Sequence, residues 1–338
     1  MKKRIGLLAL IASFVAVMGC GPEQASAPTA STQSSASPDQ APAPAKKTFR
    51  IAFSQCNSAE PYRSVQNNIF KQNAKKYEGE IELSIHDAQQ DNAKQVNQIE
   101  NIIQQGVDLL IVAPNEAAPI TPVVKKAHDA GIKVICLERD LVEPVYDQFV
   151  GADNVKIGEM AGQFVKEYLE GKKIEAPIVV EIKGLLGTKP QEERHNGART
   201  FIDTVPNVKV IEEVGNWLQD EGRKRMETLL QANPKIDVVY AHNDPMAIGA
   251  YIAARDAGRE KEMVFVGVDG LGGPDGGIKK VMDGVLACTF VYPPCAAEAL
   301  DFAVKLLRGE QVPERVILDP AKVAPDNAAE LYEQATVE

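Results

Sequence analysis

The sequence predicts an α/β protein with two similar lobes, each built on a doubly wound parallel sheet. From residue 48 onward, short apolar runs alternate with amphipathic helical stretches, and the alternation restarts in the second half of the chain. Continuous apolar runs of about 4–8 residues are typical of parallel strands that helices cover on both faces. About 290 residues follow the N-terminal segments, which suits two domains of ~150 residues each.

In the first half, apolar runs predict strands, and the stretches between them predict helices. The clearest helical pattern covers residues 92–106, where Ile99 and Ile102 share an apolar face. Gly106 suits the C-terminal cap because glycine adopts the left-handed conformation there. A similar pattern precedes Gly171. The expected strands are 50–54, 81–85, 109–113, 134–137 and 148–150.

The second half repeats this organisation. Each apolar run is again followed by a helical pattern, and repeated β-α units imply a parallel sheet with helices on its faces. The expected strands are 178–182, 208–211, 238–241, 264–268 and 286–291.

The N-terminus has the features of an export signal. Lys2, Lys3 and Arg4 precede an apolar run, 5–18, that is shorter than the roughly 20 residues a spanning helix needs. The run ends at Gly19-Cys20, which resembles the lipobox of bacterial lipoproteins, in which the cysteine is diacylated. We therefore expect a lipoprotein signal peptide over 1–20, with a plain secretory signal as the alternative. Residues 21–47 are rich in Ala, Ser and Pro and predict a disordered linker.

Charge and cysteine content limit the function further. The chain has 47 acidic and 37 basic residues, a formal charge of −10, and no basic block in its folded part, which argues against nucleic acid as a partner. Apart from Cys20, four cysteines lie outside C-x-x-C spacing and predict buried thiols: Cys56, Cys136, Cys288 and Cys295.

Polar and aromatic side chains gather directly after the apolar runs. Ligands of open parallel sheets bind beyond the carboxyl ends of the strands, so these side chains should meet at one edge. Asp, Asn and Arg form paired hydrogen bonds with sugar hydroxyls, and aromatic rings cover the apolar face of a sugar. Each residue alone could also be a turn, a helix cap or a surface pair. The candidate ligand-binding residues are Tyr62, Arg63, Glu138, Arg139, Arg194, Trp217, Asn243, Asp269 and Tyr292.

The order and spacing of eight short motifs resemble a known family, the exported sugar-binding proteins of ABC transporters of the ribose, allose and galactofuranose kind. The resemblance extends from about residue 49 to residue 325. The motifs that carry it occupy 53–55, 106–114, 137–139, 152–154, 184–188, 240–244, 246–249 and 267–270.

The resemblance implies roles for individual residues. Trp217 matches an aromatic residue that covers one face of the sugar ring, and Arg63 matches an arginine of the galactofuranose-type members. Glu138 stands where the family usually has Asp, and Tyr292 where the ribose type has a hinge-side Gln, so the identity of the sugar stays open. The residues that hydrogen-bond the sugar in the family match Arg139, Arg194, Asn243 and Asp269.

The resemblance also implies the topology of type I periplasmic binding proteins, with a three-strand hinge that closes two discontinuous lobes over the ligand. The chain should cross between lobes near Ala152 and Asp153, near Tyr292, and near Ile317. The N-terminal lobe would then comprise 48–152 plus 293–317, and the C-terminal lobe 153–292 plus 318–338.

The same residues give little support to an enzyme. The loop over 54–60 lacks G-x-G-x-x-G, the glycine-rich stretch 270–277 lacks the Lys-Ser/Thr of a phosphate loop, and no G-x-S-x-G is present. The four histidines are too scattered in sequence to predict a metal site. We therefore expect a monomeric, cofactor-free binding protein, lipid-anchored in the periplasm or cell envelope, that delivers a sugar to an ABC permease. The alternative is the same fold serving as the ligand-sensing partner of a signalling receptor.

Overall fold

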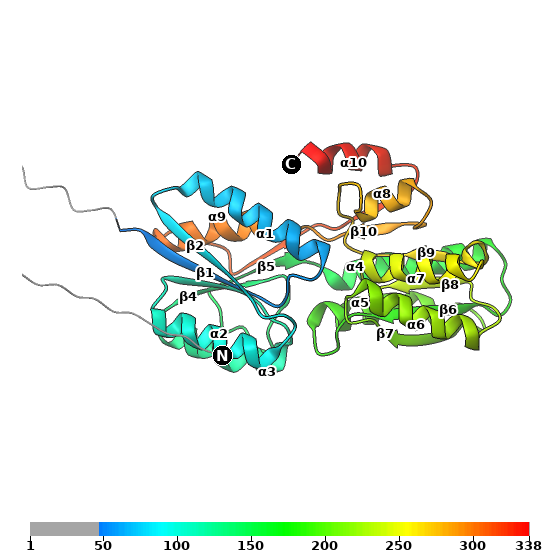
Figure 1. The fold of residues 1–338 in the computed structure, drawn as a ribbon, viewed down its shortest axis with the longest axis horizontal. Helices are drawn as coiled ribbons and strands as arrows, with labels where there is room; N and C mark the ends of the chain where they lie inside the picture. Colours follow the sequence, from blue (N-terminus) through cyan, green and yellow to red (C-terminus); the bar gives the residue numbers. More distant parts are fainter. Residues whose placement is uncertain (1–46, 338) are drawn as a thin grey trace, which may run out of the picture. The chain divides into compact units, whose positions relative to one another are not determined.

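Two parallel sheets form the centres of two lobes in the computed structural model, which describes residues 47–337. Within these residues, the sheet of the N-terminal lobe has six strands in the order β11-β5-β4-β3-β1-β2, all paired in parallel. On one of its faces α1 packs beside α9, and on the other α2 packs beside α3 (Figure 1). The elements are β1 (Phe49–Gln55), α1 (Pro61–Ala74), the 3₁₀ helix η1 (Lys75–Tyr77), β2 (Ile81–Asp87), α2 (Asn92–Gln105), β3 (Leu109–Ala113), α3 (Ala117–Asp129), β4 (Lys133–Leu137), β5 (Gln148–Ala152), α9 (Ala296–Leu307) and β11 (Arg315–Leu318).

The C-terminal lobe is built around a second parallel sheet, four-stranded within the described residues, in the order β7-β6-β8-β9. Helix α4 packs against α5, and α6 against α7. The elements are α4 (Asn154–Gly171), β6 (Ile178–Lys183), α5 (Lys189–Ile202), β7 (Lys209–Val214), α6 (Gln219–Ala232), β8 (Val238–Ala241), α7 (Asp244–Asp256), the 3₁₀ helix η2 (Glu260–Glu262), β9 (Val264–Val266), α8 (Gly277–Met282), β10 (Thr289–Val291), β12 (Ala321–Val323) and α10 (Ala328–Val337). These two sheets confirm the predicted α/β fold class.

The chain passes between the lobes at three places within the described residues. The first passage joins β5 to α4, the second joins β10 to α9, and the third joins β11 to β12. Strand β11 pairs in parallel with β5 as far as Leu318, so the third passage begins after that residue. Three adjacent connections of this kind form a hinge.

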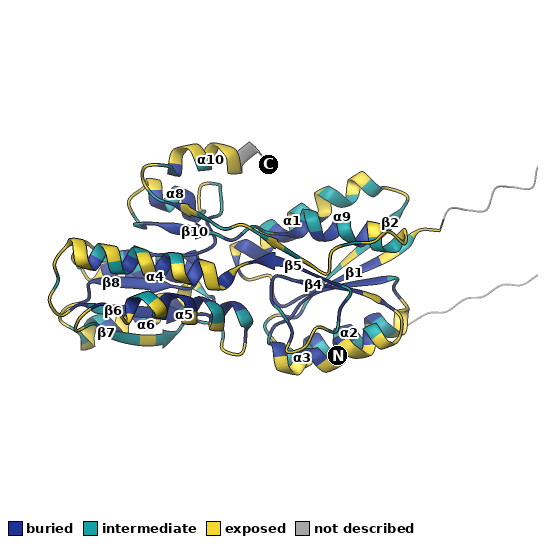
Figure 2. Cartoon of the chain, turned by 180° about the vertical axis from the view of Figure 1, so that it is seen from behind, coloured by how far each residue is buried: buried dark blue, intermediate teal, exposed yellow. Residues whose placement is uncertain are grey.

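Local sequence determines where several helices begin and end. Asp91, Asp153 and Asn243 each cap a helix by accepting the backbone N–H three residues later, at 2.9 to 3.0 Å. Gly106 ends α2 with a φ of 65°, which confirms the predicted left-handed cap. Buried residues follow the central strands, whereas the edge strands β2, β7 and β11 have none and the outer faces of the helices are exposed (Figure 2). The four cysteines in the described part of the chain are free thiols and buried, as expected.

The structure corrects the prediction for the last two strands of the C-terminal lobe. Strand β9 ends at Val266 rather than at 268, and β10 begins at Thr289 rather than at 286. Val268 accepts the backbone N–H of Asp244 at 2.6 Å, and this bond takes the chain out of the ladder. Strand β10 then pairs antiparallel with β12, which was not predicted. Two isolated parallel bridges, Val266 to Cys288 and Asp269 to Val291, link the segments around β9 and β10.

Some predictions concern residues outside the described range. The signal peptide, Cys20 and the linker, except for Lys47, belong to residues 1–46. Among the described helices, none combines the length and apolar character that a membrane crossing requires.

Candidate functional site

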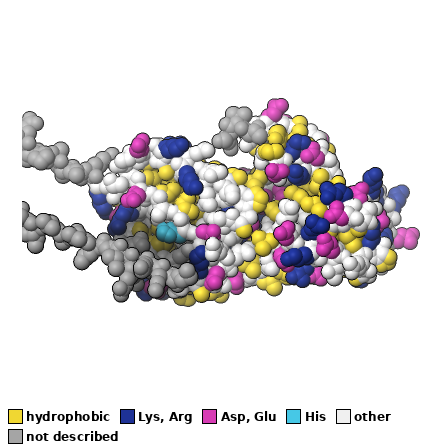
Figure 3. All heavy atoms as spheres, in the orientation of Figure 1, with side chains coloured by type: hydrophobic (Ala, Val, Ile, Leu, Met, Phe, Trp, Pro, Cys, Tyr) yellow, Lys and Arg dark blue, Asp and Glu magenta, His cyan; other side chains and the backbone are white. Residues whose placement is uncertain are grey.

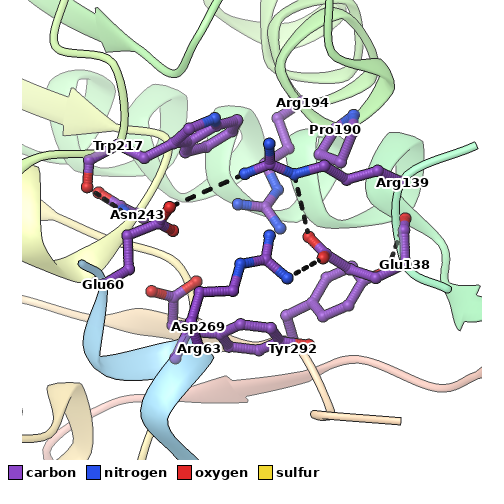
Figure 4. Close-up of a pocket in the computed structure, with 11 residues that line it drawn as sticks. Glu60, Arg63, Glu138, Arg139, Pro190, Arg194, Trp217, Asn243, Asp269 and Tyr292 are labelled. Carbon is purple, nitrogen blue, oxygen red and sulfur yellow. Dashed lines mark hydrogen bonds and ion pairs between the residues drawn. The ribbon is translucent and has the colours of Figure 1, made fainter. Parts of the chain in front are cut away.

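All nine candidate residues line one cavity between the carboxyl ends of the two sheets (Figure 4). Five come from α1, the loop after β4 and the hinge segment after β10, namely Tyr62, Arg63, Glu138, Arg139 and Tyr292. In the C-terminal lobe, Arg194 lies within α5, and Trp217, Asn243 and Asp269 lie in loops. Glu60 and Pro190, which sequence reasoning did not select, complete the lining. The structure thus brings the predicted residues together, while their role in ligand binding stays a prediction.

Charged side chains from the N-terminal lobe form a buried network. Arg63, in the first turn of α1, makes an ion pair with Glu138, which follows β4. Arg139 Nε lies 3.7 Å from Glu138, and Arg139 Nη2 lies 3.9 Å from Glu60. Burial alone would raise the pKa of Glu138, but Arg63 and Arg139 beside it lower that pKa. Glu138 is therefore held as a carboxylate.

Arg194 is the central cation of the C-terminal lobe. Its Nε donates to Asn154 at 2.9 Å, and its Nη1 donates to the carbonyl of His242 at 2.5 Å. A close contact between α4 and α5 sets this position, since a Cβ on Gly158 would lie 2.4 Å from the carbonyl oxygen of Arg194. The guanidinium lies 5.6 Å from the ring centre of Trp217, within the range of cation–π attraction.

Trp217 packs closely against the backbone that follows β6. A Cβ on Gly184 would lie 2.2 Å from the indole, so only glycine permits this contact. Asn243 holds the same loop, because its side-chain amide donates to the Trp217 carbonyl at 2.9 Å while its oxygen caps α7. Asn243 is thus a helix cap and a lining residue at once.

Two tyrosines contribute rings to the cavity and use their hydroxyls for the hinge. The Tyr292 hydroxyl accepts the Ala152 N–H at 3.0 Å and donates to the Glu138 carbonyl at 3.3 Å. The Tyr62 hydroxyl donates to the Pro293 carbonyl at 3.0 Å. Both hydroxyls are therefore already engaged, and their rings meet edge to face at 5.9 Å.

Three of the candidate residues have a left-handed backbone, which non-glycine residues rarely adopt. The φ angles are 66° for Glu138, 70° for Trp217 and 127° for Asp269. Strained backbone persists only where the surrounding contacts fix it, and it gathers at binding sites. Its coincidence with this cavity supports a functional role for these three positions.

Several polar groups of the cavity have no hydrogen-bond partner among the described residues. Three are buried donors: Arg63 Nε, Arg139 Nε and Trp217 Nε1. The fourth is the carboxylate of Asp269, which is 6% exposed. Burial and the nearby Asp244 raise the pKa of Asp269 well above its usual range. Native proteins rarely leave such groups unpaired, so this set indicates a ligand that both donates and accepts hydrogen bonds.

The lining side chains nearly fill the cavity. The cavity that remains between them has a volume of about 10 Å³, which is roughly the space for a single water molecule. A ring-shaped ligand therefore requires the lobes to separate or the arginine–carboxylate pairs to part.

Another polar cluster of the C-terminal lobe is formed by residues of β6, β7 and α5. Glu181, His195 and Glu212 hold atoms within 4.8 Å of one another, close enough to share a metal ion. However, Lys183 and Arg199 already pair with Glu212 at 2.6 and 2.8 Å. These two cations supply the positive charge that a metal would bring, so the donor set does not fit a metal site well.

Glu60 was not among the predicted site residues, because it lies at the far end of the loop between β1 and α1 rather than directly after the strand. Its carboxylate accepts the Asn57 side-chain N–H at 2.6 Å and faces Arg139. The signal that could have identified it is an acidic residue three positions before Arg63, in a loop at a strand end.

Comparison with known proteins is consistent with this geometry. The family described as periplasmic binding protein domain matches residues 51–311. The galactofuranose-binding protein of Escherichia coli (strain K12) is 32% identical over 295 residues, which cover 84% of this chain and 90% of that protein. The ribose import binding protein of Bacillus subtilis (strain 168) is 32% identical over 285 residues, covering 82% and 88%. The solved fructose binding periplasmic domain of a hybrid two component system is 38% identical with a TM-score of 0.81, covering 86% of this chain and 95% of that chain.

Proposed function

This chain belongs to the periplasmic binding protein domain family, and we propose that it captures a small sugar, a pentose or a hexose, in the cavity between its lobes and delivers it to an ABC permease. Its relatives include binding proteins for galactofuranose and ribose. The family consists of binding proteins rather than enzymes, and its periplasmic character implies a location outside the cytoplasm.

One observation carries the proposal: buried donors and an unpaired carboxylate share a cavity with aromatic rings. Arg63 Nε, Arg139 Nε and Trp217 Nε1 each lack a hydrogen-bond partner among the described residues, and Asp269 keeps acceptor oxygens. A sugar hydroxyl donates one hydrogen bond and accepts others, so adjacent hydroxyls can satisfy both kinds of group. The apolar C–H face of the ring suits the indole of Trp217.

The ligand-binding roles of the nine candidate residues are part of this proposal. In the bound state, the arginines would exchange contacts with Glu60 and Glu138 for contacts with sugar hydroxyls. On the face seen in Figure 3, acidic and basic side chains are interspersed. That distribution supports a small polar ligand better than a nucleic acid, which requires clustered cations.

We also propose that Cys20 carries a lipid anchor that holds the protein at a membrane. The support is the sequence alone, namely the cationic start, the short apolar run and the Gly19-Cys20 end. The linker over 21–47 would let the lobes reach a permease.

A thermal-shift screen of the purified protein against pentoses, hexoses and inositols tests the central proposal. A ligand that binds only the folded state adds RT ln(1 + [L]/Kd), about 4 kcal/mol at a thousand-fold excess over Kd. We expect a clear shift with one sugar or a few related sugars, and calorimetry should then give a one-to-one stoichiometry. No shift with any member of the panel would contradict the proposal.

A sensing role is the second candidate, and one comparison favours it. The fructose binding periplasmic domain noted above belongs to a hybrid two component system. Deleting the gene for this chain distinguishes the two roles. Loss of radiolabelled sugar uptake supports transport, whereas intact uptake with a lost transcriptional response to the sugar supports sensing.

A further inference from the structure

Behind Asp269 lies a second buried carboxylate, that of Asp244 at the start of α7. It accepts the Gly270 backbone N–H at 2.8 Å and the Thr289 hydroxyl at 2.6 Å. Asp244 is 3% exposed and does not line the proposed sugar cavity. Both of its hydrogen bonds go to segments that flank Asp269.

Two glycines enclose this carboxylate. A Cβ on Gly267 would lie 2.1 Å from Asp244 Oδ1, and a Cβ on Gly277 would lie 1.9 Å from Oδ2. Any side chain at either position would displace the carboxylate. The backbone of the 267–270 turn and the start of α8 therefore close directly on Asp244.

The turn that Asp244 holds has an unfavourable conformation. Asp269 has a φ of 127° and Gly270 a φ of 60°. On one side the backbone is fixed by β10, because the Asp269 N–H donates to Phe290 and its carbonyl accepts the Tyr292 N–H, both at 3.0 Å. On the other side, the bond from Gly270 to Asp244 is the side-chain contact that holds the turn. Without it, the strained Asp269 backbone would be held by the β10 segment alone.

We propose that Asp244 is a positioning residue for sugar binding, which fixes the Asp269 carboxylate and ties it through Thr289 to the strand that leads to Tyr292. This inference rests on the proposed function and adds a residue that does not touch the ligand. It assigns the enclosed carboxylate a role in affinity beyond the stability that any buried hydrogen-bonded group supplies.

A comparison of three variants of the full chain separates positioning from stability. Asp244→Ala removes both hydrogen bonds. In Asp244→Asn, the amide oxygen can accept the Gly270 N–H while its NH₂ donates to the Thr289 hydroxyl, so this variant should restore most of the lost affinity. Asp237→Ala is the matched control, because Asp237 is also a buried carboxylate that accepts a backbone N–H, from Ile178 at 2.8 Å, in the same lobe.

Calorimetry with D-ribose, D-galactose and D-fructose as probes gives the first readout. We expect Asp244→Ala to weaken binding at least tenfold and Asp237→Ala to lower the unfolding temperature with binding within threefold of wild type. Since Asp244 acts through Asp269, the double variant Asp244→Ala/Asp269→Ala should bind no more weakly than Asp269→Ala alone. Additive losses, or unchanged binding in Asp244→Ala, would overturn the inference.

Amide hydrogen exchange of the sugar-free protein gives a second readout. The Gly270 amide should be protected in the wild type, in Asp244→Asn and in Asp237→Ala, and should exchange at least tenfold faster in Asp244→Ala. Equal protection of Gly270 in Asp244→Ala overturns the inference whatever the sugar result. A wild type that binds no sugar contradicts the proposed function instead, and the exchange result then decides the positioning role by itself.

Discussion

The substitution Asp269→Ala should weaken sugar binding strongly while it stabilises the sugar-free protein. The Asp269 carboxylate is buried and accepts no hydrogen bond from the described residues. Because the Asp269 carboxylate is already removed from water in the sugar-free protein, sugar binding carries no further cost for desolvating it. Hydrogen bonds from sugar hydroxyls to this carboxylate therefore contribute fully to the affinity. A hydrogen bond contributes about 1 kcal/mol when the carboxyl is neutral and about 2 kcal/mol when it is charged. Losing one should therefore weaken binding about 5- to 30-fold, and losing two about 30- to 1,000-fold.

The effect on stability should depend on pH in a defined direction. Burial, and secondly the charge of Asp244, raise the pKa of Asp269 well above its usual range. A carboxyl whose pKa rises on folding stabilises the fold below its unfolded-state pKa, about 3.9, and loses that contribution as the pH rises. Asp269→Ala removes this loss, so the variant should gain stability relative to wild type as the pH rises above about 4.

Calorimetry at pH 7 and urea unfolding across this pH range measure the two effects. Asp269→Asn is the control, because it keeps the shape and one acceptor oxygen but not the charge, and should fall between wild type and Asp269→Ala in affinity. Binding by a folded Asp269→Ala within threefold of wild type would refute the reasoning. A difference in stability between wild type and Asp269→Ala that does not change with pH would show that folding does not raise the pKa of Asp269.

Three further predictions test other parts of the molecule. Trp217 is the only tryptophan, so saturating sugar should shift the emission spectrum, and Trp217→Ala should reduce affinity more than thermal stability; unchanged emission with a bound sugar contradicts the stacking role. Cys20→Ser should move the protein from the membrane to the soluble fraction and abolish fatty-acid labelling, whereas a wild type already soluble and unlabelled excludes the anchor. Burial would raise the pKa of Glu181, but hydrogen bonds from His195 and His242 lower it to about 2. Its stabilising contribution is then complete above about pH 4.5 and lost toward pH 2, so Glu181→Gln should cost about 3 kcal/mol at pH 7 and progressively less on acidification, as urea unfolding can show.

The parallel strands could be predicted because each is a continuous apolar run with an amphipathic helix after it. Strand β12 could not, because it has three residues, lies between Pro320 and Pro325, and includes Lys322. Its partner β10 was predicted, but not its antiparallel pairing, since pairing across 30 to 34 residues of sequence depends on tertiary contacts.

The site followed from a single rule, that ligands meet the carboxyl ends of parallel strands. This rule predicted which residues lie at the site, but not which of their polar atoms are already engaged in hydrogen bonds within the protein. Nothing local in the sequence shows that the Tyr292 hydroxyl is engaged by the hinge, whereas Trp217 Nε1 has no hydrogen-bond partner within residues 47–337. The role of Asp244 was equally hidden, because it depends on Gly267 and Gly277 approaching from other segments.

The pairing of β11 with β5 has a consequence for the order in which the protein folds during synthesis. Strand β5 (148–152) is synthesised long before β11 (315–318), the strand that pairs with it at the edge of the first sheet. Helix α1 is likewise synthesised long before α9, the helix that packs beside it. The second sheet draws its four strands from one continuous segment, 178–266. Because local contacts form faster than distant ones, we expect the later-synthesised sheet to be completed first on the ribosome. The earlier lobe would meanwhile expose an unpaired edge strand, which makes that half of the nascent chain the natural target for a holding chaperone.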